Sequence, residues 1–241
     1  ELTPLNGAVE RMREIKEDRE VDALQKTADM ISEILDEVIS ALNPGVTEKD
    51  VAWQIKSLAR EAGAEGLSFP SIVASGPNSA LPHAVPTNRK IRDREPIILD
   101  AGVKLNGYCS DITRTVFLGE PDPFFKTIYR TVRQAQLAAL EKIRPLVQSS
   151  HVDAVARDII ADAGFGAYFG HGLGHGVGLA THEGPRLGPS SAAELRAGAV
   201  FTVEPGIYFP GRGGVRLEEM VALEGEGPRI LTHNDHFYDF S

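Results

Sequence analysis

Apolar residues recur three or four positions apart through the first part of the chain, which is the spacing of one buried helix face. This pattern predicts a helix over residues 9–42, ended by the Asn-Pro-Gly sequence that follows. A second helix is predicted from a capping Thr47 to Gly63, and we expect Trp53 within it to lie in the core.

Shorter apolar runs after residue 90 predict antiparallel strands that join in two hairpins. Strands over residues 95–101 and 108–118 flank Asn106-Gly107, a dipeptide typical of two-residue hairpin turns because both positions adopt positive φ. Strands over 199–204 and 215–223 flank a turn around Gly211. The other predicted elements are a strand over 69–74 and helices over 123–144 and 150–164. Helices in groups and strands in hairpins indicate an α+β fold with a single domain over residues 1–241.

Each predicted hairpin brings two carboxylates together. A two-residue turn places Asp100 opposite Thr113, so Asp111 lies on the same face as Asp100, with the two Cβ atoms about 7 Å apart. A three-residue turn in the second hairpin places Glu204 opposite Glu218, with Cβ atoms about 5 Å apart. Solvated surface charge is the alternative for each pair. Asp100 and Glu204 both end apolar runs, however, and a carboxylate that ends a buried strand needs a partner.

Histidine and glycine concentrate in one segment of the chain. More than half of the 24 glycines lie between Gly164 and Gly214, and His171, His175 and His182 lie among them. His175 adds an imidazole to the four carboxylates, a ligand set that suits Mn²⁺, Fe²⁺, Co²⁺ or Zn²⁺. Five ligands with four negative charges exceed what one structural zinc ion takes and point to two adjacent divalent ions, as in metal-assisted hydrolysis.

Composition narrows the classes of partner. The 241 residues include 25 Lys and Arg against 34 Asp and Glu, a formal charge of −9 that argues against nucleic-acid and anionic-membrane partners. Cys109 is the single cysteine, so we expect no intramolecular disulfide, a buried thiol and a cytoplasmic location. No apolar run has the length of a membrane helix, and residues 1–20 are charged and linker-like.

Six segments combine glycine, histidine and carboxylate residues in a distinctive way. They are residues 75–83 (SGPNSALPH), 99–102 (LDAG), 110–115 (SDITRT), 170–183 (GHGLGHGVGLATHE), 202–208 (TVEPGIY) and 214–219 (GVRLEE). In this order they resemble the pita-bread metallopeptidases, the M24 family of methionine aminopeptidase, aminopeptidase P and prolidase (Xaa-Pro dipeptidase). The resemblance implies a curved antiparallel sheet flanked by helices, in two pseudo-symmetric halves.

The resemblance also implies a role for each ligand. Asp100 would bind one ion, His175 and Glu204 the other, while Asp111 and Glu218 would bridge the two. Manganese is favoured among Mn, Co, Fe and Zn. A hydroxide bridging the ions would attack the peptide bond, and Glu204 would pass a proton to the leaving nitrogen.

Five further residues gain roles from the resemblance. His182 would hydrogen-bond the substrate and steady the tetrahedral intermediate, and His83 would line the end of the site that receives proline. His171, Tyr208 and Arg216 resemble residues of the branch that cleaves Xaa-Pro bonds and would bind substrate. For Arg216 the alternative is that its charge neutralises the ligand carboxylates.

We therefore expect a metallo-exopeptidase that cleaves the N-terminal peptide bond of peptides, with proline at P1′. The alternatives are a methionine aminopeptidase-type exopeptidase and a non-catalytic peptide-binding module on the same fold. His171 and Tyr208 weigh against the first alternative, and the intact five-ligand set weighs against the second. Full-length relatives usually carry an N-terminal domain that we do not expect within this sequence, so the preferred peptide length is open, and a homodimer is compatible with the sequence.

Overall fold

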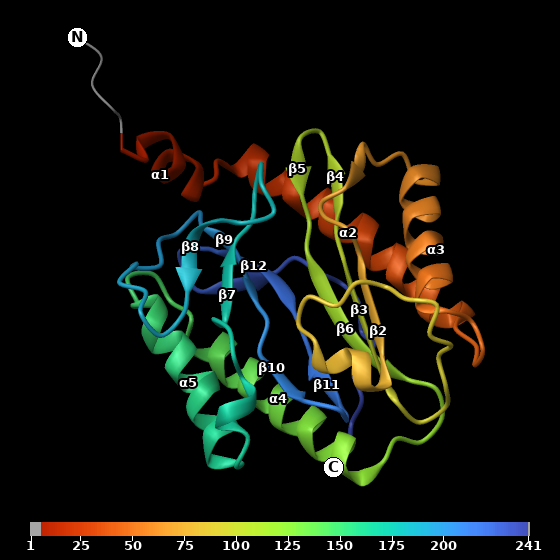
Figure 1. Cartoon of the computed structure of the whole chain (residues 1–241). Coiled ribbons are helices and arrows are strands. Elements are labelled where there is room, and N and C mark those ends of the chain that lie inside the picture. Colours follow the sequence, from red (N-terminus) through yellow and green to blue (C-terminus); the bar gives the residue numbers. More distant parts are fainter. Residues whose placement is uncertain (1–5, 241) are drawn as a thin grey trace.

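Two groups of helices flank the antiparallel strands of the protein (Figure 1). A computed structural model describes residues 6–240. The first half comprises α2 (Asp18–Ala41), α3 (Glu48–Glu61), β2 (Ile72–Ser75), β3 (Pro96–Ala101) and β6 (Ile112–Phe117). The second half comprises α4 (Pro123–Lys142), α5 (Ser149–Asp162), β7 (Gly174–Gly176), β9 (Val200–Val203) and β12 (Glu219–Leu223).

The strand order repeats between the two halves. β3 lies between β2 and β6, and β9 lies between β7 and β12, with each pair antiparallel. Two helices precede the three strands in each half, so the predicted α+β fold with two pseudo-symmetric halves is confirmed. The remaining elements are α1 (Ala8–Glu14), β1 (Gly66–Leu67), β4 (Val103–Leu105), β5 (Tyr108–Cys109), β8 (Glu183–Leu187), β10 (Gly206–Phe209), β11 (Gly213–Arg216), β13 (Pro228–Ile230) and the 3-10 helices η1 (Gly76–Ala80) and η2 (Gly166–Tyr168).

The strands predicted over 108–118 and 215–223 are each interrupted at a carboxylate. Asp111 lies between β5 and β6, and Glu218 lies between β11 and β12. Both interruptions occur where the chain passes from one sheet to another. The backbone N–H of Glu218 donates to the carbonyl of Thr113 (3.1 Å), which joins the two halves at this point.

The helix predicted over 9–42 consists of α1 and α2, because the chain bends between them. Ile15 forms an isolated β-bridge with Ala199, and Lys16 Nζ lies 2.8 Å from Glu183 Oε1 in a buried ion pair. The end of the segment expected to be linker-like is therefore bound to the body of the fold; residues 1–5 lie outside the described part of the chain.

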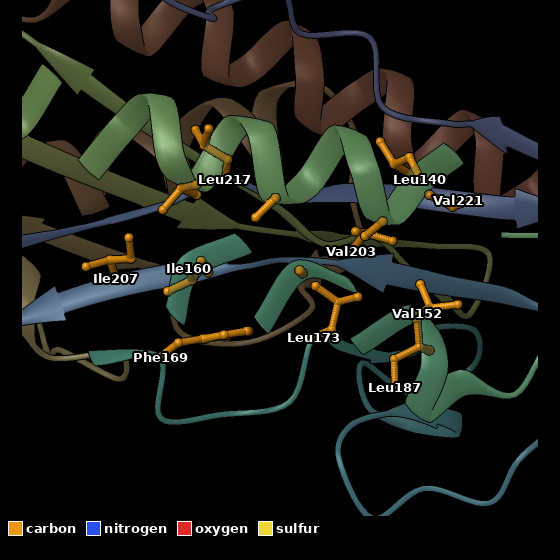
Figure 2. Close-up of a cluster of buried hydrophobic side chains, with 14 of the residues drawn as sticks. Leu140, Val152, Ile160, Phe169, Leu173, Leu187, Val203, Ile207, Leu217 and Val221 are labelled. Atoms are coloured by element: carbon orange, nitrogen blue, oxygen red, sulfur yellow. The ribbon is translucent and has the colours of Figure 1, made fainter. Parts of the chain in front are cut away.

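Each half has its own apolar core. In the second half, α4 and α5 pack against the sheet through residues such as Leu140, Val152 and Val203 (Figure 2). In the first half, the cluster draws on α2, α3 and β3. Cys109 is buried as predicted. None of the helices in residues 6–240 combines the length and apolar character needed to span a bilayer.

The prediction that Trp53 belongs to the core is wrong, since 66% of the residue is exposed. Val51 and Ile55 are the buried residues of this part of α3. Trp53 lies two positions from each of them, about 200° around the helix, and this rotation places it on the solvent face.

Candidate metal centre and active site

The strand registers predicted from the two turns are confirmed. Asp100 pairs with Thr113 in the β3–β6 ladder. In the second hairpin, Gly206 pairs with Arg216 and Val203 pairs with Glu219. These two pairs lie on either side of Glu204 and Glu218 and share one register, so Glu204 and Glu218 face each other between the two ladders.

The five predicted metal ligands converge in one cluster. Their ligand atoms and that of His182 form three overlapping groups, in each of which all the atoms lie within 4.8 Å of one another. The groups are Asp100, Asp111 and Glu218; His175, Glu204 and Glu218; and Asp111, His175 and His182. His175 Nε2 lies 3.3 Å from Glu204 Oε1 and 3.7 Å from Asp111 Oδ2. The two hairpins and β7 thus bring together residues that lie far apart in the sequence.

The carboxylates are poorly solvated, and their charges are costly without a cation. Burial raises the pKa of Glu204 to about 7 and the pKa of Asp100 above its usual range. Burial and then repulsion from neighbouring carboxylates raise the pKa values of Asp111 and Glu218 well above their usual range. Asp100 Oδ1 is buried and has no hydrogen-bond partner among the described residues. A divalent cation would satisfy this oxygen and keep the cluster ionised, so the donor set fits metal ions.

His175 is prepared to act as a ligand. Its Nδ1 contacts the carbonyl of Gly176 (3.1 Å), which selects the tautomer that donates from Nδ1 and leaves the Nε2 lone pair free. Burial lowers its pKa to about 4, so the ring is neutral at neutral pH. A neutral imidazole held through its other nitrogen is the usual state of a metal-binding histidine.

Arg216 connects the carboxylates to the surrounding polar residues. Its Nη2 donates to Asp100 Oδ2 (2.5 Å), and its Nε donates to Thr113 Oγ1 (3.1 Å). The Thr113 hydroxyl donates in turn to Glu218 Oε2 (2.7 Å). Arg216 is 3% exposed, and these bonds favour the neutralising role over substrate contact.

Tyr208 and His171 extend this network. Arg216 Nη1 donates to the Tyr208 oxygen (2.9 Å), and the same oxygen lies 2.9 Å from His171 Nε2. His171 Nδ1 contacts the Gly172 carbonyl (2.7 Å), so Nε2 accepts and the Tyr208 hydroxyl donates to it. Burial lowers the pKa of His171 to about 4, which agrees with a neutral acceptor ring.

His182 and His83 lie beside the cluster and are more exposed. The His182 ring meets the His175 ring edge to face, with centroids 4.0 Å apart. Burial, followed by the charge of His83, lowers the pKa of His182. His83 lies near enough to Asp100 and His182 to influence the pKa values of both electrostatically.

Arg186 is a residue that the sequence analysis missed. It pairs with His175 across β7 and β8, and after burial its charge contributes to the lowered pKa of both His175 and His182. Arg186 is exposed, and its side chain forms no hydrogen bond or ion pair within residues 6–240. The glycine-rich segment before it carries no strand pattern, so its sequence did not place Arg186 beside the ligands.

Comparisons with known proteins agree with this geometry. A sequence model of metallopeptidase family M24 matches residues 22–224. A Bacillus subtilis (strain 168) protein named uncharacterized peptidase YqhT is 42% identical over 234 residues, which are 97% of this chain and 66% of that protein.

Solved structures show the same fold. A prolidase from Pyrococcus furiosus gives a TM-score of 0.95 at 37% identity, covering 97% of this chain and 69% of that one. An X-Pro aminopeptidase from Thermotoga maritima MSB8 gives a TM-score of 0.93 at 38% identity, covering 95% of this chain and 65% of that one. The predicted pita-bread fold is therefore confirmed, and the chain spans about two thirds of the length of these relatives. The chain belongs to metallopeptidase family M24.

Proposed function

We propose that this chain carries the catalytic site of a dinuclear metallo-exopeptidase that cleaves the first peptide bond of peptides with proline in the second position. The observation that carries the proposal is the buried cluster of four carboxylates and His175. Two divalent ions, manganese by preference, would polarise the scissile carbonyl and lower the pKa of a water nucleophile.

The overlap of the three groups supports the division of ligands. Asp111 and Glu218 each belong to two groups, one with Asp100 and one with His175. Asp111 and Glu218 would therefore be shared between two ions, while Asp100 would hold one ion and His175 and Glu204 would hold the other.

The other residues of the site would handle protons and substrate. Glu204, a carboxylate of the cluster, would take a proton from the nucleophile and pass it to the leaving nitrogen. His182, exposed beside His175, would donate a hydrogen bond to the substrate oxygen as negative charge develops there. His83 would contact the proline end of the substrate. Tyr208 and His171 would order the wall of the site.

Arg186 favours dipeptides among the Xaa-Pro substrates. Its guanidinium lies beside the candidate ligands and has no ion-pair partner in the described part of the chain. The free carboxylate of a dipeptide would be a matching partner, whereas a longer peptide has a neutral amide at that position. A change of Arg186→Gln should lower kcat/KM for the dipeptide by roughly 10- to 100-fold, the loss of one bond to a charged group, and leave a tripeptide nearly unaffected.

The experiment is hydrolysis of three substrates in the presence of Mn²⁺ or Co²⁺, with a chelator control. The substrates are an Xaa-Pro dipeptide, an Xaa-Pro-Xaa tripeptide and a Met-Ala-Xaa tripeptide. We expect cleavage before proline that the chelator abolishes, with the dipeptide cleaved faster. Preferential cleavage of the methionine peptide would support the methionine aminopeptidase alternative. Binding of two ions without hydrolysis of any substrate would support a non-catalytic peptide-binding module.

A further inference from the structure

The loop that carries His83 presents its middle to solvent. Residues 76–90, named here the His83 loop, follow β2 and appear in yellow in front of the strands in Figure 1. Leu81 and Val85, on either side of His83, are 58% and 78% exposed. Ala84 is buried in one cluster with Ile98 and Tyr208, so the loop contacts the body of the fold beside His83. The anchoring of its two ends then decides how firmly the exposed residues around that contact are held.

Glu48, the first residue of α3, provides this anchor. Its side chain is fully buried, and both of its oxygens accept hydrogen bonds from the loop and its flanks. Oε1 accepts from the N–H and the hydroxyl of Ser75, both at 2.8 Å. Oε2 accepts from the N–H (3.0 Å) and the hydroxyl (2.6 Å) of Thr87, and Asn78 Nδ2 lies 3.1 Å from both oxygens.

The start of α3 reinforces the same contacts. The N–H of Glu48 donates to the carbonyl of Arg89, and the N–H of Lys49 donates to the carbonyl of Thr87, both at 3.1 Å. The carboxylate therefore lies at the positive end of the helix dipole, where an anion is stabilised. The loop is held at Ser75 and again at Thr87, and His83 lies between the two points.

The second half of the molecule offers an internal comparison. Ser149, the first residue of α5, donates from its N–H to the carbonyl of Ala193 (2.8 Å), just as the first residue of α3 does toward its own loop. Its hydroxyl makes one bond, to Ser191 Oγ (2.8 Å). The loop over 188–198 that this contact holds carries no residue assigned to the site, because His182 and Arg186 precede it in the connection between β7 and β9. The carboxylate clamp therefore occurs in the half whose loop presents His83.

We propose that Glu48 is a positioning residue that holds His83 at the substrate end of the site by clamping the His83 loop. A second contact ties the loop to the metal centre, since the carbonyl of Pro82 accepts from Arg216 Nη1 (3.3 Å). The proposal rests on the proposed function, because His83 needs a fixed position only if substrate binds beside it.

The change Glu48→Gln tests the clamp by keeping the size of the side chain while removing acceptor capacity. We expect faster amide hydrogen exchange across residues 76–90 and unchanged Mn²⁺ binding. The value of kcat/KM should fall by roughly 10- to 100-fold, because a shift of about 1 Å in a positioned group costs that much. In a His83→Ala background the same change should cost less than about threefold, since the two residues act as a unit.

A matched pair of variants distinguishes loss of the anchor of the His83 loop from a general loss of folding. Thr87→Ala and Ser191→Ala each remove one hydroxyl from one loop anchor. The first should lower kcat/KM and speed exchange in the His83 loop, while the second should leave kcat/KM unchanged. The proposal would be overturned if Thr87→Ala and Ser191→Ala changed kcat/KM equally. It would also be overturned if the effects of Glu48→Gln and His83→Ala on kcat/KM were additive. If the unaltered protein cleaves no peptide, the proposed function fails, and unchanged exchange in Glu48→Gln then separately overturns the clamp.

Discussion

Replacing Thr113 by valine tests how much the hydrogen bonds around the carboxylates contribute to the metal centre. The fully buried hydroxyl of Thr113 donates to Glu218 and accepts from Arg216. Valine keeps the shape and removes both bonds, so two buried charged groups each lose a partner. At about 1.5–3 kcal/mol for a bond to a charged group, the free energy of unfolding of the metal-free protein should fall by roughly 3–6 kcal/mol. Metal affinity should fall by roughly 10- to 100-fold, because Glu218 loses the bond that orients it.

Thr115→Val is the matched control for this change. Thr115 lies two residues along β6, on the same face, and is also fully buried. Its hydroxyl donates to the carbonyl of Arg216 (2.8 Å) and accepts from the N–H of Arg216 (3.1 Å), both neutral groups. The expected loss of stability is about 1–3 kcal/mol, with metal affinity unchanged. Urea unfolding with a chelator and calorimetric titration with Mn²⁺ measure the two quantities. Equal metal affinities in the two variants would refute the reasoning.

Three further predictions concern backbone strain, pH and catalysis. Leu146 has a φ of 69° and is 70% exposed, so Leu146→Gly should raise the free energy of unfolding by roughly 0.5–1 kcal/mol in urea titrations; a loss of stability would show that the exposed side chain has a partner. In the metal-free protein the raised pKa of Glu204, about 7 when folded, favours folding at low pH, and this stability is lost as pH rises through 7. The lowered pKa of His175, about 4, makes stability increase with pH, but only below about pH 6.5, where an unfolded histidine is protonated. Above pH 6.5 the effect of Glu204 remains, so Tm measured with a chelator should fall between pH 6.5 and 8. Saturating Mn²⁺ should reverse this trend, because metal binding needs ionised carboxylates. Identical profiles of Tm against pH with Mn²⁺ and with chelator would contradict a metal site. His182→Ala should still bind two ions, measured by metal analysis, yet lose most of its turnover; full turnover would exclude the role given to His182.

Local turn chemistry explains why the carboxylate pairs could be predicted from the sequence. Asn106 and Gly107 have φ values of 51° and 84°, as the two-residue turn requires. Once the turn is set, the alternation of side chains along the strands determines that Asp100 and Asp111 share a face. This inference needs no contact with any other part of the chain, and the same holds for the second hairpin.

Contacts between distant segments decided the rest of the site. Arg186 owes its place to the pairing of β7 with β8, although neither segment shows a strand pattern in the sequence. Glu48 resembles an ordinary acidic residue in a first helical turn, and it becomes a buried clamp only because the His83 loop folds over the start of α3. Sterics within a turn act over a few residues, so most of the helices, the hairpin registers and the clustering of the five candidate ligands could be predicted from the sequence. Which polar groups are buried and which are paired could not be predicted in this way, because desolvation and hydrogen bonding depend on the segments that the fold brings together.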